Sequence, residues 1–154
     1  MNQLSYAPLP GHASVSDIIL LGERMFKESR FSKLEFSFEK AKRYAFDVLT
    51  NPEYISVGAF FKRELVGMIL GDCGDVLPFT HDSVATEHLL YVDPGFREVR
   101  VAFTLIQQFI AQAKERGAKD IIFSNGTGYE PERVGKLFER CGMTKVGGIY
   151  YYGG

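Results

Sequence analysis

The chain has 154 residues, of which 45% are hydrophobic and 24% are charged. This composition is typical of one soluble globular domain with a single core and excludes a two-domain organisation, so we expect one domain over residues 1–154. The 18 Lys and Arg residues nearly balance 19 Asp and Glu residues, which gives a formal net charge of −1. This balance disfavours a nucleic-acid partner or an anionic membrane, because both attract a cationic surface.

The cysteines and the N-terminal segment bear on metal binding and location. Cys73 and Cys141 lie far apart and form no CxxC or Cys/His cluster, so we expect neither a structural zinc site nor a disulfide framework. Residues 1–11 lack the basic and apolar regions of an export signal. We therefore expect no metal, no membrane segment and a cytoplasmic location.

The first half of the chain changes from a helical period to a strand period. Apolar residues recur at helical spacing after Ser14 and again after Ser37, and serine is a favourable helix cap. From Ile55 the apolar period becomes two, which is typical of strands. The predicted elements are a strand over 4–7, a helix that Ser14 or Ser16 caps, a helix from Ser37 to Asn51-Pro52, and a β-hairpin with strands over 55–61 and 65–70.

The second half predicts a strand, a helix and a strand in succession. A strand over 85–92 ends at Asp93-Pro94-Gly95, and the helix that follows keeps its apolar residues on one face until Gly117. The remaining predicted elements are a buried strand over 121–123, a helix that begins at Glu130-Pro131-Glu132, and a last strand over 143–152. The order β-α-α-β-β-β-α-β-α-β predicts an α/β fold with a mixed sheet, antiparallel first and parallel across the crossover.

The junction between the strand over 85–92 and the next helix is the most informative segment for function. Unpaired backbone N–H groups at a helix start form an anion site, and Arg97 and Arg100 add charged donors that suit phosphate. The alternative is an ordinary loop with two solvated arginines, because helix starts are common and ligand sites are few. We expect function here, at the carboxyl end of the first parallel strand.

Two motifs resemble those of a known family, the GCN5-related N-acetyltransferase (GNAT) superfamily. The family signature is Val-x-Pro followed by Arg/Gln-x-x-Gly-x-Gly/Ala, and this chain has Val92-Asp93-Pro94 and then Arg97-Glu98-Val99-Arg100-Val101-Ala102. Arg100 replaces the central glycine, which is similar to phage- and prophage-type members of the superfamily. Leu137-Phe138-Glu139-Arg140-Cys141-Gly142-Met143 resembles the family's Leu-Tyr-Glu-Lys-Leu-Gly-Phe.

The resemblance implies that acetyl-CoA binds along this segment. The backbone N–H groups of Val99 through Ala102 would hold the pyrophosphate, and the strand over 90–92 would pair with the pantetheine arm at an open edge. Glycine lets phosphate approach the backbone closely, so Arg100 either swings out and adds a salt bridge, as we expect, or fills the site. The predicted cofactor-binding residues are Leu90, Tyr91, Val92, Arg97, Glu98, Val99, Arg100, Val101, Ala102 and Asn125.

Glu87 is the predicted general base, acting directly or through water. It precedes Val92 by five positions on the strand that resembles the family's acetyl-binding strand. Partial burial beside Leu89 and Tyr91 would raise the pKa of its carboxyl toward neutrality, although a solvated strand glutamate is an equal alternative. His88 also titrates near neutral pH, but simple alternation places it on the opposite face of the strand unless a bulge changes the parity.

The chain departs from the family pattern near its last helix. Phe138 stands where the family often has a tyrosine as general acid, and a phenyl ring cannot donate a proton, so Tyr129 is the candidate replacement. Pro131 stands where an asparagine commonly contacts the cofactor, and Asn125 is the candidate substitute. Substrate contacts are expected from two segments, 28–36 and 78–82.

These observations predict an N-acetyltransferase that moves acetyl directly from acetyl-CoA to a primary amine of a small molecule or peptide. We expect neither a metal nor a covalent enzyme intermediate, because neither cysteine has a paired histidine. The alternative is a GNAT-fold module that binds CoA or a protein partner without efficient turnover, which the changes at Arg100, Pro131 and Phe138 favour. The balanced charge disfavours a nucleic-acid modifier of the same fold.

The C-terminal segment predicts assembly. Family members usually place two strands after the final helix, whereas the short segment after Gly142 is most simply one strand. An unpaired edge with Val146, Ile149 and three consecutive tyrosines would attract a second chain. We therefore expect a homodimer through this strand, against the alternative that Gly147-Gly148 forms a small hairpin within one monomer.

Overall fold

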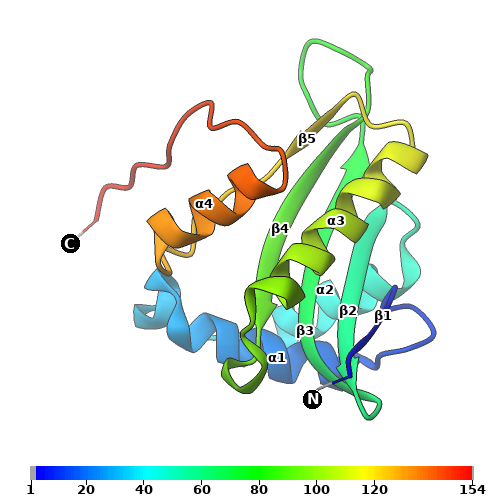
Figure 1. The fold of residues 1–154 in the computed structure, drawn as a ribbon, viewed down its shortest axis with the longest axis vertical. Coiled ribbons are helices and arrows are strands. Elements are labelled where there is room, and N and C mark those ends of the chain that lie inside the picture. The colour runs from blue at the N-terminus through cyan, green and yellow to red at the C-terminus, as the bar shows by residue number, and fades with distance from the viewer. Residues whose placement is uncertain (1–2, 154) are drawn as a thin grey trace.

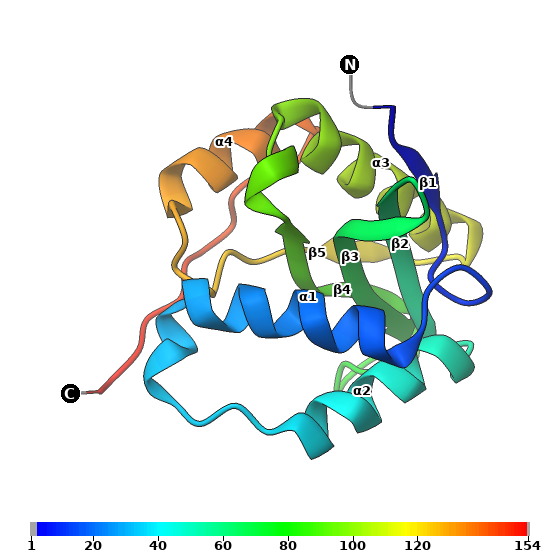
Figure 2. The same ribbon diagram turned by 90° about the horizontal axis from the view of Figure 1, so that it is seen from below.

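The computed structural model describes residues 3–153, which form one five-stranded sheet with helices on both faces (Figures 1 and 2). The strands are β1 (Ser5–Ala7), β2 (Tyr54–Phe61), β3 (Glu64–Gly74), β4 (Val84–Val92) and β5 (Asp120–Ile122). The α-helices are α1 (Val15–Glu28), α2 (Phe38–Thr50), α3 (Val99–Glu115) and α4 (Pro131–Arg140), and two short 3₁₀ helices are η1 (Arg30–Lys33) and η2 (Pro94–Phe96). The fold class is the predicted α/β arrangement with a mixed sheet.

The strands lie in the order β1-β2-β3-β4-β5. Each of the first four strands is antiparallel to its neighbours in this group, whereas β5 is parallel to β4 because α3 carries the chain back across the sheet. The β2–β3 hairpin closes through Lys62 and Arg63, and both have positive φ, as the tightest hairpin loops require. The predicted hairpin and crossover are therefore confirmed.

Helices cover the two faces of the sheet differently. Figure 2 shows α1 and α2 on one side of the sheet and α3 and α4 on the other, and Figure 1 shows α4 beside β4. The face under α1 and α2 holds a core that includes Ile18, Leu21 and Met68. The face under α3 holds a second core that includes Leu105 and Phe109. Burial of these apolar side chains on both faces stabilises the sheet.

The helix starts follow the sequence expectations closely. Ser14 caps α1 through a reciprocal capping box with Asp17, and the Ser37 hydroxyl accepts from the N–H of Lys40 at the start of α2. Asn51 ends α2, as the following proline predicts. The helical period of α3 is also confirmed, since its inward positions include Leu105, Ile106, Phe109 and Ala113, all fully buried.

The predicted strand over 143–152 is wrong, because residues 143–153 have no strand assignment. Figure 1 shows this segment leaving α4 and running away from the sheet. The neighbouring edge strand β5 has only three residues, so it offers few backbone groups for a ladder, and Gly147-Gly148 adds flexible backbone. Within the described residues, the observed order of elements therefore ends at α4, without the expected last strand.

Candidate functional site

A β-bulge in β4 decides which side chains reach the site. Leu70 pairs with Leu89, but the next residue, Gly71, pairs with Glu87, so His88 is an extra residue in β4. The bulge changes the side-chain parity of the strand. Leu90 packs with the core under α3, whereas Leu89 and Tyr91 pack with the core under α1 and α2. The expectation that Glu87 shares a face with Leu89 and Tyr91 is therefore wrong.

Gly71 places Glu87 on the α3 side of the sheet. Residues directly opposite each other on antiparallel strands share a face, so Glu87 faces the same way as Gly71. A Cβ at Gly71 would lie 2.7 Å from Cζ of Phe109 in α3 and 2.2 Å from the carbonyl oxygen of Thr86. Only glycine fits between the bulged strand and the Phe109 ring at this point.

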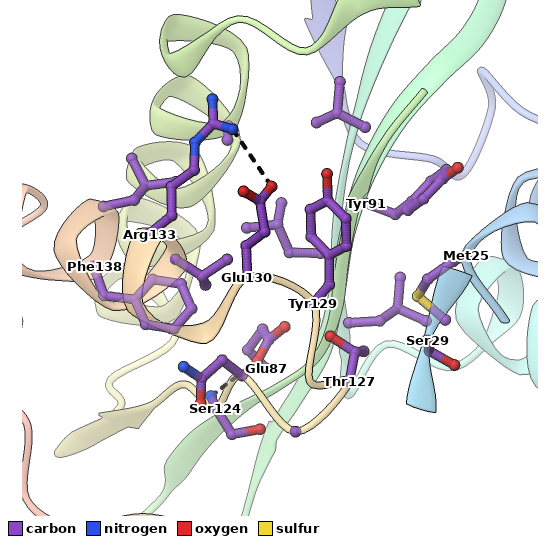
Figure 3. Close-up of a pocket in the computed structure, with 18 of the residues that line it drawn as sticks. Met25, Ser29, Glu87, Tyr91, Ser124, Thr127, Tyr129, Glu130, Arg133 and Phe138 are labelled. Atoms are coloured by element: carbon purple, nitrogen blue, oxygen red, sulfur yellow. Dashed lines mark hydrogen bonds and ion pairs between the residues drawn. The ribbon is translucent and has the colours of Figure 1, made fainter. Parts of the chain in front are cut away.

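The two parallel strands diverge beyond the bulge and leave an open edge. β5 pairs with β4 only from Val84 to Thr86, so the part of β4 from Glu87 to Val92 has no strand neighbour on its β5 side among the described residues. A cavity of about 620 Å³ opens along this edge (Figure 3). Its walls come from β4, the start of α3, the β5–α4 connection, α4 and the end of α1. Such a splayed edge can accept an extended ligand by backbone pairing.

Glu87 lies at the inner end of this cleft, near Ser124 (Figure 3). It is only 6% exposed, and its Oε1 accepts a hydrogen bond from the backbone N–H of Ser124 at 3.2 Å. Burial raises the pKa of the Glu87 carboxyl to about 7, and the Ser124 hydrogen bond opposes this shift without cancelling it. A carboxyl with this pKa can accept and release a proton at neutral pH.

The start of α3 lies at the other end of the cleft and has unpaired donors. Its N-cap residue, Glu98, makes no side-chain hydrogen bond to the helix, unlike the serine caps of α1 and α2. The N–H of Val101 donates to the Glu98 carbonyl, while those of Val99 and Arg100 have no acceptor among residues 3–153. Free N–H groups and the helix dipole favour an anion at this position.

Arg97 joins three parts of the cleft wall. Its Nε donates to the Val92 carbonyl, and one terminal nitrogen lies 2.9–3.0 Å from both carboxylate oxygens of Glu28 at the end of α1. The other terminal nitrogen donates to the Tyr129 hydroxyl at 2.9 Å. Tyr91 also donates to Glu28. Burial opposes ionisation of Glu28, but the hydrogen bonds from Arg97 and Tyr91 outweigh it and lower its pKa.

The structure separates the two arginines that the sequence analysis grouped together. Arg97 lines the cleft, whereas Arg100 lines a different cavity beside Tyr6 and Thr104. The side chain of Val101 is buried in the core under α3. The other predicted cofactor-binding residues line the cleft: Leu90, Tyr91, Val92, Arg97, Glu98, Val99, Ala102 and Asn125.

His88 is engaged on the α2 side of the sheet. Its Nδ1 lies 2.8 Å from the Tyr44 hydroxyl, and its Nε2 lies 3.2 Å from a carboxylate oxygen of Asp72. The ring also packs edge-on against Tyr54. These contacts hold the extra residue of the bulge toward α2, and the preceding residue, Glu87, reaches the opposite face.

The three predicted site residues around α4 make different contacts. Phe138 packs edge-on against Phe123, with ring centroids 5.4 Å apart, so its ring serves as a wall of the cleft. Asn125 donates from Nδ2 to the Pro131 carbonyl, which ties the end of β5 to the start of α4. The Tyr129 side chain lies in the cleft (Figure 3), and its hydroxyl accepts a hydrogen bond from Arg97.

Sequence reasoning did not identify two of the polar contacts in the cleft. The Ser124 N–H reaches Glu87 only because β5 ends beside the bulge, and no local pattern signals this contact. Glu28 was expected only as part of a substrate segment, and its pairing with Arg97 spans 69 positions. Among residues 3–153, no three His, Cys, Asp or Glu side chains gather as metal ligands would.

The fold and the cleft agree with a family match over most of the chain. Residues 22–143 match the model of the acetyltransferase (GNAT) family. The chain therefore belongs to the GNAT acetyltransferase family, which makes it an acyltransferase by class. No curated protein sequence matches the chain significantly. No helix within the described residues is both long enough and apolar enough to cross a bilayer.

Solved structures of low sequence identity share the fold. One is an aminoglycoside acetyltransferase, HMB0005, from an uncultured soil metagenomic sample, with 18% identity, 98% of each chain covered and a TM-score of 0.71. A second is the aminoglycoside N-acetyltransferase AAC(6')-Iy in complex with CoA, with 13% identity, 100% of this chain and 96% of that chain covered and a TM-score of 0.76. A third is a ribosomal-protein-alanine N-acetyltransferase from Brucella melitensis, with 18% identity, 99% and 98% coverage and a TM-score of 0.67.

Proposed function

We propose that this protein transfers acetyl from acetyl-CoA to a primary amine of a small molecule or peptide. The observation that carries the proposal is the cleft itself, in which an open strand edge connects an uncapped helix start with a buried carboxyl of pKa about 7. The helix start suits the pyrophosphate, and the edge of β4 suits the amide-bearing pantetheine arm. The solved relative with bound CoA supports the same cosubstrate.

In this proposal Glu87 removes a proton from the ammonium form of the acceptor, directly or through one water. The neutral amine then attacks the thioester carbonyl, the new C–N bond forms, and the C–S bond breaks. The CoA thiolate takes up a proton, so the products are the acetylated amine and CoA. Free N–H groups on the open edge of β4 can stabilise negative charge on the carbonyl oxygen during attack.

Tyr129 is the candidate donor for the leaving thiolate. Its hydroxyl lies in the cleft, whereas Phe138 has no proton to give.

Two observations favour a second function. Phe138 cannot act as a general acid, and Arg97, which would suit phosphate, is already paired with Glu28. This second candidate is a module that binds CoA or a protein partner without efficient turnover.

Thiol release from acetyl-CoA across a panel of amines, together with calorimetry of CoA binding, separates the two candidates. Turnover supports the enzyme, and binding without turnover supports the module. Glu87→Gln is expected to lower turnover about 10²–10⁴-fold with CoA affinity little changed, because it removes only the base. Unchanged turnover in this variant would exclude Glu87 as the base.

The two arginines provide a matched pair for the phosphate end of the cleft. Arg97→Ala is expected to weaken CoA binding about 10- to 100-fold if its guanidinium exchanges Glu28 for phosphate. Arg100→Ala removes the same charge from the neighbouring cavity and is expected to leave affinity nearly unchanged. Equal losses in both variants would contradict this placement of the pyrophosphate.

A further inference from the structure

The cleft has a wall on the α1 side that the proposed cosubstrate does not use (Figure 3). This acceptor wall consists of Met25, Ser29, Arg30, Phe31 and Ile149, from the end of α1, from η1 and from the C-terminal segment. Acetyl-CoA, as proposed above, occupies the edge of β4 and the start of α3. The acceptor wall is therefore a surface of the cleft that is open to the amine.

Arg30 is fixed in this wall through its backbone and one edge of its side chain. Its backbone N–H donates to the Thr127 carbonyl at 2.8 Å, and its Nε donates to the Gly126 carbonyl at 2.7 Å. The guanidinium carbon lies 4.2 Å from the ring centroid of Phe31 and 5.2 Å from that of Tyr151. These contacts orient the planar group and leave its two terminal nitrogens free to bind.

Among the described residues, the charge of Arg30 has no carboxylate partner. Arg97 pairs with Glu28, and Arg133 pairs with Glu130. Lys136 and Arg140 in α4 also line the cleft without an ion pair in the part of the chain that the structure describes, but both are exposed to solvent. Within residues 3–153, no carboxylate lies within ion-pair distance of Arg30, and its terminal nitrogens have no protein acceptor. A half-buried, oriented guanidinium without a partner is suited to a planar anion from outside the chain.

We propose that Arg30 binds a carboxylate of the acceptor, so the acceptor is an amino acid or another small amine that carries a carboxylate. This inference rests on the proposed acetyl transfer, because Glu87 must receive the amine while Arg30 holds the other end of the molecule. The bidentate fork of arginine matches carboxylate geometry. A polycationic amine gains nothing from Arg30 and meets its positive charge, so the proposal separates this chain from the aminoglycoside acetyltransferases that share its fold.

The test uses pairs of acceptors for acetyl from acetyl-CoA. Each pair consists of an amino acid, or β-alanine, and the same compound with its carboxylate converted to an amide. The amide keeps the amine and the side chain but lacks the carboxylate. The natural protein is expected to acetylate the acids more efficiently than the amides. Arg30→Gln is expected to lower kcat/KM for the acids about 10- to 100-fold, mainly through a higher KM, and to change kcat/KM for the amides little. Arg30→Lys should retain part of the preference, because it keeps the charge and loses the fork.

Lys33→Gln is the control, because Lys33 lies over the same Tyr151 ring but does not line the cleft. It should leave the preference for acids unchanged, and thermal melting verifies that each variant folds.

Amides that react as well as the acids, or equal losses of kcat/KM for acids and amides in Arg30→Gln, would overturn the assignment of Arg30. If CoA binds but no amine reacts, acetyl transfer itself fails. Calorimetric titration of amino acids and amides into the CoA complex then decides the carboxylate site alone: binding of acids that depends on Arg30 supports it, and equal binding or none refutes it.

Discussion

The burial of Glu87 couples its protonation to the stability of the protein. Its pKa is about 7 in the folded chain, against 4.5 for an exposed glutamate. Between these values the folded protein keeps a proton that the unfolded chain has lost. The stability that the protonated carboxyl provides is therefore fully present below about pH 4.5 and is lost as the pH rises through 7.

Glu87→Gln removes this dependence, because the amide does not ionise. We expect the free energy of unfolding of the variant, relative to the natural protein, to rise on the order of 3 kcal/mol between pH 4 and pH 8. Urea unfolding at both pH values measures the difference. Glu39→Gln is the control, since this side chain is 88% exposed and loses the same charge. Parallel pH profiles for Glu87→Gln and the natural protein would show that the carboxyl is not held protonated.

At the scale of elements, the bulge of β4 depends on the absence of a side chain at Gly71. In Gly71→Ala the new methyl group would collide with the Thr86 carbonyl and the Phe109 ring, so the strand or α3 must shift. We expect a loss of stability of about 1–3 kcal/mol and a lower activity, because the shift moves Glu87. Denaturant unfolding and thiol release measure the two effects.

Gly22→Ala in α1 is the matched control for this prediction. A Cβ at Gly22 would have no atom within 4 Å, and alanine favours the helix by up to about 1 kcal/mol, so this variant should be neutral or more stable. A Gly71→Ala protein as stable as the Gly22→Ala protein would mean that the bulge tolerates a side chain.

Local patterns predicted most of the elements because each has a local cause. The serine caps, the Pro and Gly stops and the period of α3 all act within a few residues, and the helix bounds followed from them. The bulge has no such cause. Glu87 and His88 are both compatible with a regular strand, and only their contacts with Ser124, Tyr44 and the partner strand select the bulged form.

The predictions for the site divide in the same way. The motif around Arg97 predicted a strand, a turn and a helix start that are contiguous in sequence, and the structure places this helix start at the cleft. The placement of Arg100 required the position of β1, which the motif does not contain. Arg30 was expected only within a broad substrate segment. Its partners Gly126 and Thr127 lie nearly a hundred positions away, so its orientation could not be read locally.

At the scale of the whole molecule, the C-terminal segment still predicts assembly although it forms no strand. Ile149 lines the cleft and Tyr151 lies against Arg30, whereas Tyr150 and Tyr152 are 95% and 105% exposed. Ile149 and Tyr151 thus contact the body of the protein with part of their surface, whereas Tyr150 and Tyr152 face solvent. Figure 1 shows it beyond the short edge strand β5, whose outer side has no neighbour among the described residues. Unpaired strand edges and exposed aromatic rings are features of association surfaces.

We expect a homodimer in which the outward tyrosines bury each other's rings near the twofold axis. Replacing Tyr150 and Tyr152 together by serine should raise the dimer dissociation constant at least about tenfold, because large aromatic contacts dominate such interfaces. Light scattering over a concentration series measures this change. Tyr151→Ser is the control, since Tyr151 faces Arg30 and its loss should affect the acceptor wall more than assembly. A monomer at tens of micromolar, or a dimer that the double variant leaves intact, would refute assembly through this segment.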